Sequence, residues 1–370
     1  MQRRITLFIY SLGYGGIQRI VVRMANEFVK RGYAVNLVLA KRTGALISDV
    51  DASVNVINLN ASSVLYSIAG LFRHIRNNRP HVLFSAETPI NIVAIWAKLL
   101  FGSKIRLVIS VRSNISEYSK NEAVWYSRFT PILVRVFYRY ADALVTVSQG
   151  VLDDLKAISK SAFARGTVIY NPVVDLERST VSPTTAPHRW LDDRDVPVLL
   201  AVGRLTAQKN YPVLLQAFAD ARKSRNMRLI ILGGGKMLDD LINQCKKYEI
   251  SEHVHFAGFV DNTAAYYSFA SLFVLSSDYE GFGSVLVEAM AHGCPVVSTD
   301  CPSGPREILM NGTYGALVSP GDASALSNAI LKSLENSPDI ESLKSRAADF
   351  SVDKSISQYL ALFFPEESSI

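Results

Sequence analysis

The first half of the chain alternates short apolar runs with segments of helical period. Runs rich in β-branched residues lie at 5–10, 34–40, 54–59, 82–85, 105–110 and 144–148, and they predict buried strands. Stretches such as 17–31 and 90–100 repeat apolar residues at the spacing of one helix face. Strands and helices in alternation predict a parallel, doubly wound α/β sheet with helices on both faces.

The same rhythm restarts after residue 197. Predicted strands lie at 198–202, 228–232, 253–256, 272–275 and 295–298, and predicted helices at 211–222, 238–247, 263–269 and 284–292. Two further helical segments follow Asp322, the last at 352–364. Residues 178–197 interrupt the pattern with Ser, Thr, Pro and scattered charges, as linkers do.

This pattern divides the 370 residues into two domains. We predict an N-terminal domain at 1–177, a linker at 178–197, a second domain at 198–350, and a last helix with its tail at 351–370. Ligands of doubly wound domains bind outside the carboxyl ends of the strands. We therefore expect two Rossmann-like sheets that face a cleft.

Charge is distributed unevenly between the two halves. Residues 1–175 contain 22 Lys and Arg against 10 Asp and Glu, a net charge of +12, whereas residues 176–370 carry −6. The basic half favours an anionic partner, such as a phosphorylated substrate or a membrane face. Nucleic acid is a poor fit, because no recognition module is visible and the acidic half would repel a phosphate backbone.

The spacing of the cysteines and the lengths of the apolar runs indicate the cellular compartment. The three cysteines, Cys245, Cys294 and Cys301, show no paired spacing, which favours a reducing cytoplasm over a disulfide framework or a zinc site. The first apolar run is too short for a signal peptide, and the longest, at 90–101, is shorter than the ~20 residues of a spanning helix. We expect a cytoplasmic protein that is not integral to a membrane.

The segment 280–288 carries the strongest chemical pattern. It reads Glu-Gly-Phe-Gly-Ser-Val-Leu-Val-Glu and follows the predicted strand 272–275. Gly283 allows a close backbone approach, and a helix that begins near Ser284 offers free N–H groups to an anion. Glu288 lies on an apolar helix, where a carboxylate needs partners, and sugar or ribose hydroxyls would supply them. The alternative is a surface helix with Glu280 at its cap and Glu288 in solvent.

A second pattern follows the first strand of the second domain. Residues 203–210 read Gly-Arg-Leu-Thr-Ala-Gln-Lys-Asn, which places Arg204 and Lys209 at the phosphate-binding edge of a Rossmann-like unit. Two fixed cations there would neutralise a diphosphate leaving group, as a metal ion does elsewhere. For either residue alone an exposed basic turn would be the better explanation, and it is their position together with Glu280 and Glu288 that favours function.

Together these motifs resemble glycosyltransferase family 4, a group of retaining enzymes with the GT-B fold. The resemblance rests on Gly15-Gly16, Gly203-Arg204, Lys209, the pair Glu280 and Glu288, and the run 293–298, and it covers the whole chain. It implies a last helix that crosses back onto the N-terminal domain. The run Thr299-Asp-Cys-Pro-Ser-Gly-Pro-Arg-Glu-Ile is similar to a subgroup that extends polyprenyl-diphosphate-linked bacterial glycans.

The resemblance also assigns roles. It makes Arg204 and Lys209 ligands of the donor diphosphate, Glu280 the carboxylate near the transferred sugar, and Glu288 the ribose ligand. The remaining nucleotide contacts that it implies are Phe259, Gly283, Ser284 and Val285, with Gly16 closing on the phosphates and the acceptor.

Two positions of the first domain need comment. Many relatives carry Glu where this chain has Gln18, which keeps the length and an acceptor oxygen. Arg112 falls where many relatives place a His that faces the reacting sugar. A guanidinium stays protonated and cannot act as a base, so Arg112 would bind the acceptor phosphate or the sugar. A surface arginine is the alternative.

The segment 123–140 predicts an aromatic and basic helix. Trp125, Phe129, Leu133, Val136 and Phe137 recur at helical spacing, and three arginines interrupt them: Arg128, Arg135 and Arg139. Pro131 should kink or restart the helix. Such a helix either packs on the core or lies in the interface of an anionic membrane, and the +12 charge favours membrane contact.

The sequence therefore predicts a retaining transferase that uses a UDP-sugar, an N-acetylhexosamine or galactose, and extends a lipid-linked glycan on the inner face of the plasma membrane. The alternatives are a GDP-mannose-dependent mannosyltransferase and a catalytically silent subunit that binds nucleotide-sugar. We expect no metal or other cofactor. The D-x-D pair Asp49 and Asp51 lies in a connection before a strand, which is a poor place for a metal site.

Overall fold

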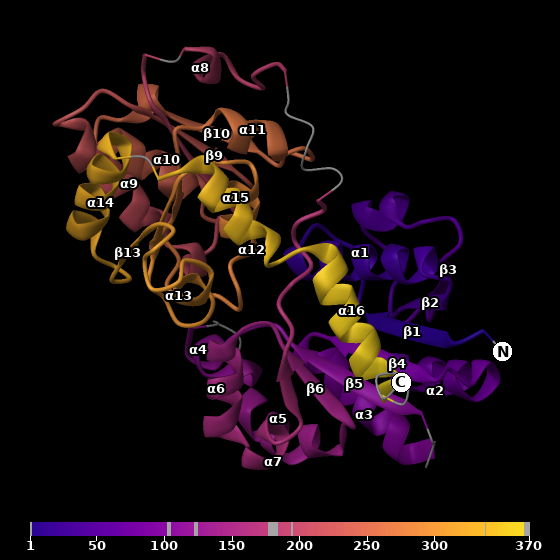
Figure 1. The fold of residues 1–370 in the computed structure, drawn as a ribbon. Coiled ribbons are helices and arrows are strands. Elements are labelled where there is room, and N and C mark those ends of the chain that lie inside the picture. The colour runs from indigo at the N-terminus through magenta and orange to yellow at the C-terminus, as the bar shows by residue number, and fades with distance from the viewer. Residues whose placement is uncertain are drawn as a thin grey trace. The chain divides into compact units, whose positions relative to one another are not determined.

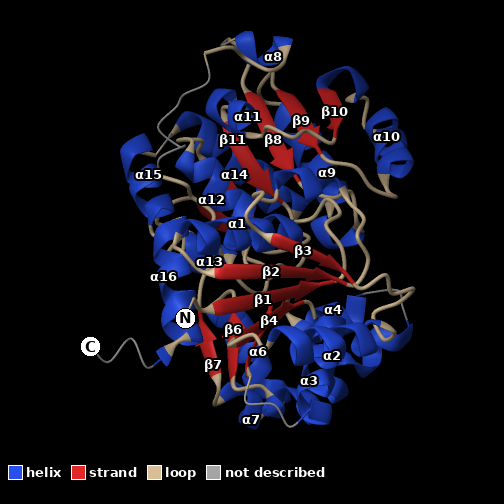
Figure 2. Cartoon of the chain, turned by 90° about the vertical axis from the view of Figure 1, so that its right-hand side faces the viewer, coloured by secondary structure: helices blue, strands red, loops and turns tan. Residues whose placement is uncertain are grey.

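The computed structural model describes residues 2–101, 105–121, 125–176, 184–193, 195–336 and 338–365. The chain divides into two compact units. Unit 1 comprises Met1–Pro172 and Val352–Ile370, and unit 2 comprises Val173–Ser351. Each unit contains a parallel sheet flanked by helices (Figures 1 and 2). The predicted α/β class with two doubly wound sheets is confirmed.

Unit 1 has a sheet in the order β3-β2-β1-β4-β5-β6-β7 among the described residues. Its strands are β1 Arg4–Ile9, β2 Ala34–Leu39, β3 Asn55–Asn58, β4 Val82–Ala86, β5 Arg106–Val111, β6 Ala143–Thr146 and β7 Gly166–Val168. Its helices are α1 Gly16–Lys30, α2 Ser67–Asn78, α3 Thr88–Phe101, α4 Ile115–Asn121, α5 Thr130–Phe137, α6 Gln149–Ile158, α7 Lys160–Phe163 and α16 Val352–Phe363, with 3-10 turns at Ala45–Asp49, Trp125–Phe129 and Tyr138–Tyr140.

Helix α16 completes the core of unit 1, as the predicted crossing-back helix requires. It lies beside α1 on one face of the sheet, and in Figure 1 it is the yellow helix beside the N-terminal strands. The ring of Phe363 is 5.6 Å from that of Phe28, and the ring of Tyr359 is 5.6 Å from that of Phe84. These side chains are fully or almost fully buried, so α16 is part of this core although it is far away in sequence.

Unit 2 has a sheet in the order β10-β9-β8-β11-β12-β13 among the described residues. Its strands are β8 Val198–Val202, β9 Arg228–Leu232, β10 Val254–Gly258, β11 Leu272–Leu275, β12 Val296–Thr299 and β13 Ala316–Val318. Its helices are α8 Arg189–Asp192, α9 Tyr211–Arg222, α10 Leu238–Lys247, α11 Ala264–Phe269, α12 Ser284–Ala291, α13 Pro305–Ile308, α14 Ala323–Glu335 and α15 Ile340–Ala348, with 3-10 turns at Ala207–Lys209 and Ser251–His253.

Both sheets reverse their direction of winding at one point. In unit 1 the chain builds β2 and β3 on one side of β1 and then returns to place β4 on the other side. In unit 2 it builds β9 and β10 on one side of β8 and then places β11 on the other. The crevice at the carboxyl ends of the strands at such a switch point is where doubly wound folds bind ligands.

The structure corrects the predicted helix at 123–140. Ala123 lies outside the described residues, and from Trp125 onward the segment forms a 3-10 turn, the helix α5 and another 3-10 turn. Pro131 lies in the first turn of α5, where its missing N–H costs nothing, so the proline restarts the helix as one of the two predicted outcomes.

Several other helices and strands of the structure differ from the predicted ones. Three helices follow Asp322 instead of two, because α15 precedes α16. The strands β7 and β13 have three residues each, too few to show a pattern. Within the predicted linker, α8 packs on unit 2, where Arg228 stacks on Trp190 and pairs with Asp193 at 3.1 Å.

Candidate active site

The loops that follow β8 and β11 meet at the switch point of unit 2. They are residues 203–210 and 276–283, and hydrogen bonds join them. The backbone N–H of Asp278 donates to the carbonyl of Gln208 at 2.9 Å, and the Gln208 side-chain amide donates to the carbonyl of Tyr279 at 2.9 Å. The two predicted motifs therefore lie side by side and are joined by hydrogen bonds.

An ion pair lies between these two loops. The Nζ of Lys209 is 2.5 Å from the Oε1 of Glu280, and the hydroxyl of Ser277 donates to the same oxygen at 2.7 Å. The side chains of Lys209 and Glu280 are only 16% and 9% exposed. Each buried charge needs the other, because one alone would be left uncompensated. Glu280 thus fixes the position of the Lys209 ammonium.

Arg204 lies in the same loop as Lys209, but in a different environment. Its side chain is exposed and has no hydrogen bond or ion pair with the part of the chain that the structure describes, while its carbonyl accepts the backbone N–H of Thr206 at 2.9 Å. Its neighbour Gly203 packs against the loop after β9, where a Cβ on Gly233 would lie 2.1 Å from the Gly203 carbonyl oxygen. Gly233 and Gly235 thus allow close backbone packing between the loops, because a Cβ on Gly235 would lie 2.3 Å from the Leu205 carbonyl oxygen.

Helix α12 begins at this edge of the sheet. Gly283 precedes it in the left-handed region, with φ +93° and ψ +45°, which suits glycine. Ser284, Val285 and Glu288 share the half-buried side of the helix, while most of its other residues are buried. The structure therefore places these predicted nucleotide contacts on one side of the helix.

Glu288 has a protein partner that the sequence did not indicate. The hydroxyl of Tyr267, on α11, donates to the Oε2 of Glu288 at 3.0 Å. Burial and the charge of Glu288 raise the pKa of Tyr267 well above its usual value, so the tyrosine remains a proton donor. Tyr267 belongs to a different helix, and no spacing rule connects it with Glu288.

The run 299–308 braces the Glu280 loop. The hydroxyl of Thr299 donates to the carbonyl of Ser277 at 2.6 Å, and the backbone N–H of Glu280 donates to the carbonyl of Pro302 at 3.1 Å. Gly304 has φ +99°, and a Cβ there would lie 1.9 Å from the Phe282 carbonyl oxygen. Only a glycine allows this run to pack so closely.

Phe259 follows β10 at the same edge of the sheet. Its side chain is exposed, and Gly258 before it turns the chain with φ +70°. An exposed aromatic ring is suited to stacking on a nucleotide base. The predicted base contact stays a prediction.

Two predicted residues belong to unit 1. Gly16 is the first residue of α1, and a Cβ there would meet no atom within 4 Å, so the space beside it is open. Arg112 follows β5 and points toward the crossing-back helix. Its guanidinium donates to the Oδ1 of Asn171 at 2.9 Å and to the hydroxyl of Tyr359 at 3.4 Å. Its role as a ligand stays a prediction.

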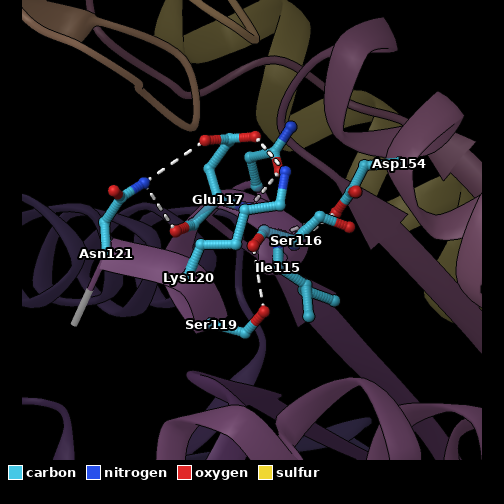
Figure 3. A network of polar contacts seen from close by, with 8 residues as sticks. Ile115, Ser116, Glu117, Ser119, Lys120, Asn121 and Asp154 are labelled. Atoms are coloured by element: carbon cyan, nitrogen blue, oxygen red, sulfur yellow. Dashed lines mark hydrogen bonds and ion pairs between the residues drawn. The ribbon is translucent and has the colours of Figure 1, made fainter. Parts of the chain in front are cut away.

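The segment after Arg112 is held by a polar network (Figure 3). Asp154 accepts hydrogen bonds from the backbone N–H groups of Ile115 and Ser116, at 2.7 and 3.2 Å, and so caps the start of α4. Within α4, Glu117 pairs with Lys120 at 2.9 Å. The loop that carries Arg112 therefore has a fixed end.

The D-x-D pair has a local structural role. The carboxylate of Asp51 accepts the backbone N–H of Ser53 at 2.8 Å, and the carbonyl of Asp49 accepts from Asn26 at 2.9 Å. Among the described residues, no three His, Cys, Asp or Glu side chains gather as a metal site would require. Turnover without a metal remains a prediction.

Comparisons with known proteins give the family of the chain. Residues 14–178 match the family described as Glycosyltransferase Family 4, and residues 185–350 match Glycosyl transferases group 1. The chain is 28% identical over 357 residues to N-acetylgalactosamine-N,N'-diacetylbacillosaminyl-diphospho-undecaprenol 4-alpha-N-acetylgalactosaminyltransferase of Campylobacter jejuni, covering 93% of this chain and 94% of that one.

Solved structures show the same fold at lower identity. Sucrose-phosphate synthase of Thermosynechococcus elongatus superposes with a TM-score of 0.85 at 19% identity, covering 100% of both chains. The protein HepE of Anabaena in complex with UDP-glucose superposes with a TM-score of 0.81 at 20% identity, covering 99% of this chain and 100% of that one. The predicted GT-B architecture is confirmed.

Proposed function

The chain is a glycosyltransferase of family 4 with the GT-B fold, and we propose that it transfers a sugar from a UDP-sugar to a lipid-linked glycan with retention of configuration. The observation that carries the proposal is the arrangement of Arg204, Lys209 and Glu280 at the switch point of unit 2. Two cations at this edge match the charge of a departing nucleoside diphosphate.

The proposed chemistry needs no covalent intermediate. The bond between the sugar C1 and the diphosphate oxygen breaks, and a bond between C1 and the acceptor oxygen forms on the same face. The proton of the acceptor hydroxyl passes to the departing phosphate oxygen. Arg204 and Lys209 stabilise the negative charge that develops there, and Glu280 holds Lys209 in place.

The donor and acceptor classes are supported by relatives. The Campylobacter jejuni relative is named for an acceptor linked to undecaprenol through a diphosphate and for the transfer of N-acetylgalactosamine. HepE, which has the same fold, binds UDP-glucose. In this chain, Glu288 with its partner Tyr267 would receive the ribose hydroxyls, and we propose an N-acetylhexosamine or galactose as the sugar.

Isothermal titration with UDP and GDP tests the proposal. We expect UDP to bind at least about tenfold more tightly than GDP. Glu288→Gln should weaken UDP binding about tenfold, since it removes a charged hydrogen-bond acceptor. Glu252→Gln is the control, because Glu252 is exposed on a 3-10 turn of the same unit and should bind UDP like the wild type.

Each rival predicts a different outcome. Tighter binding of GDP would favour a mannosyltransferase. UDP binding without transfer from any UDP-sugar to a polyprenyl-diphosphate sugar would favour a catalytically silent subunit. Unchanged UDP binding by Glu288→Gln would remove Glu288 from the site.

We also propose that unit 1 binds an anionic membrane through α5 and its flanking 3-10 turns. Among the described residues, no helix is both long and apolar enough to cross a bilayer. One side of this segment presents apolar side chains to the outside, because Phe129, Ile132 and Val136 are 51%, 58% and 42% exposed, while Val134 and Tyr138 are buried in the core. The arginines of the same segment are exposed as well: Arg128, Arg135 and Arg139. Insertion and charge attraction would act together there.

Co-sedimentation with vesicles tests this docking. We expect the protein to bind phosphatidylglycerol vesicles at low salt, to bind neutral vesicles weakly, and to be released as ionic strength rises, because salt screens charge attraction. Changing Arg128, Arg135 and Arg139 to Glu should abolish binding and leave UDP affinity unchanged. The control changes three exposed arginines of the same unit to Glu: Arg73, Arg76 and Arg79. Equal loss in both variants would indicate a general charge effect and contradict docking through α5.

A further inference from the structure

Ser277 is a fully buried residue beside the ion pair of Lys209 and Glu280. It lies two residues after β11, and its hydroxyl donates to the Oε1 of Glu280 at 2.7 Å. The ammonium of Lys209 binds the same oxygen at 2.5 Å. Both donors therefore use one oxygen, although a carboxylate has two oxygens that accept hydrogen bonds.

The second oxygen of this carboxylate differs from the first. No residue that the structure describes donates a hydrogen bond to the Oε2 of Glu280. Glu280 is only 7% exposed, yet Oε2 is not one of the enclosed side-chain atoms that lack a partner in the described ranges. Oε2 is therefore open to a ligand at the switch point of unit 2, where doubly wound sheets bind their ligands.

Lys209 alone would not decide which oxygen stays open. Its ammonium is a compact charge with three rotatable donors, and the last torsion of a glutamate side chain has a broad minimum. Ser277 is more restrictive, because it lies three residues before Glu280 in the same loop and its own carbonyl accepts the hydroxyl of Thr299 at 2.6 Å. The Ser277 hydroxyl thus fixes the carboxylate with Oε1 inward and Oε2 outward.

The other titratable neighbours do not disturb this arrangement. Burial and the charge of Glu280 raise the pKa of Tyr211 and of Cys301, so both groups stay neutral. The hydroxyl of Tyr211 donates elsewhere, to the carbonyl of Gly203 at 3.1 Å. A change at Ser277 would therefore alter the orientation of the carboxylate and leave its ion pair in place.

We infer that Ser277 is a positioning residue, which directs the Oε2 of Glu280 to accept a hydrogen bond from a hydroxyl group of the transferred sugar. A sugar hydroxyl suits this oxygen because it carries a proton to donate, whereas the phosphate oxygens of a UDP-sugar carry none. The inference rests on the proposed function and adds the residue that orients the carboxylate. Oε1 would hold Lys209 for the diphosphate, and Oε2 would receive the sugar.

Isothermal titration with UDP and with UDP-sugars tests the two oxygens separately. The sugar ligands are UDP-N-acetylgalactosamine, UDP-N-acetylglucosamine and UDP-galactose. We expect wild type to bind UDP and at least one of these UDP-sugars. Ser277→Ala should bind that UDP-sugar about tenfold more weakly, because the carboxylate is no longer held toward the sugar, and should keep its UDP Kd within about twofold of wild type.

Ser271→Ala is the matched control. Ser271 directly precedes β11, so it lies at the other end of the same strand, and its hydroxyl accepts the backbone N–H of Val198 at 3.1 Å. This variant also loses one hydroxyl that is hydrogen-bonded within unit 2. It should bind UDP and the UDP-sugar like the wild type.

A double-mutant cycle shows whether Ser277 acts through Glu280. Glu280→Gln removes the charge of the carboxylate and should weaken binding of the UDP-sugar by itself. If Ser277 acts by orienting that carboxylate, adding Ser277→Ala to Glu280→Gln should cause less than about a twofold further loss. A further tenfold loss would mean that Ser277 acts independently of Glu280 and would contradict the inference.

The remaining outcomes distinguish this inference from the proposed function. Wild-type affinity of Ser277→Ala for the UDP-sugar, or an equal loss of affinity for UDP and the UDP-sugar, would overturn the role of Ser277. A wild type that binds UDP but none of the three UDP-sugars would overturn it as well. A wild type that binds no UDP would instead overturn the proposed function.

Discussion

Replacing Arg204 with alanine should lower kcat about 10²- to 10³-fold, the loss typical of removing one group that stabilises developing negative charge. The protein should remain folded, because the Arg204 side chain is exposed and makes no hydrogen bond or ion pair with the described residues. Steady-state kinetics with differential scanning calorimetry would show the two effects separately, and Tm should change by no more than about 2 °C.

Two controls accompany this variant. Lys223→Ala removes an exposed cation at the end of α9 and should leave kcat unchanged. Wild-type activity should persist in EDTA, since arginine and lysine would carry the charge that a metal carries elsewhere. Loss of activity in EDTA with recovery on adding Mn²⁺ would contradict turnover without a metal. A normal kcat in Arg204→Ala would contradict its role at the leaving group.

Replacing Lys209 with alanine should affect both the fold and the activity. The carboxylate of Glu280 would remain buried without its ion partner, which costs about 3–5 kcal/mol of the free energy of unfolding. For a unit of this size, that corresponds to a fall in Tm of roughly 6–20 °C. kcat should fall as well, because the ammonium is one of the two proposed diphosphate ligands.

A double variant separates these two losses. Lys209→Met with Glu280→Gln replaces the ion pair with neutral side chains of similar size, which is often neutral for stability. We expect calorimetry to show most of the lost Tm restored, while kcat stays at the level of Lys209→Ala or lower. Recovery of both quantities would mean that the pair serves the fold alone. An unchanged Tm in Lys209→Ala would mean that the pair stabilises nothing.

Much of the fold could be predicted because most of the described strands are buried apolar runs. In β1, for example, every residue from Ile5 to Ile9 is buried, and such a run differs clearly from a helix with one apolar face. Helix α15 escaped prediction because it buries only Leu343 and Ala347, too few to give a periodic signal. The strands β7 and β13 are held by their neighbours in the sheet more than by their own composition.

The candidate site was predictable only in part. Lys209 and Glu280 could each be selected from their positions after strands, but their ion pair joins segments 71 residues apart. The bond from Tyr267 to Glu288 was not predictable either, because it joins two helices. Pairing across elements becomes visible only when the sheet order is known.

The position of α16 has a consequence for synthesis on the ribosome. The core of unit 1 requires Tyr359 and Phe363, yet the whole of Val173–Ser351 is translated between Pro172 and these residues. At about 5–20 residues per second, that interval lasts roughly 10–35 s. Unit 2 is then complete in sequence while the groove for α16 on the nascent unit 1 is still open. Its apolar lining, which includes Phe28 and Phe84, is exposed for that time to chaperones and to other nascent chains.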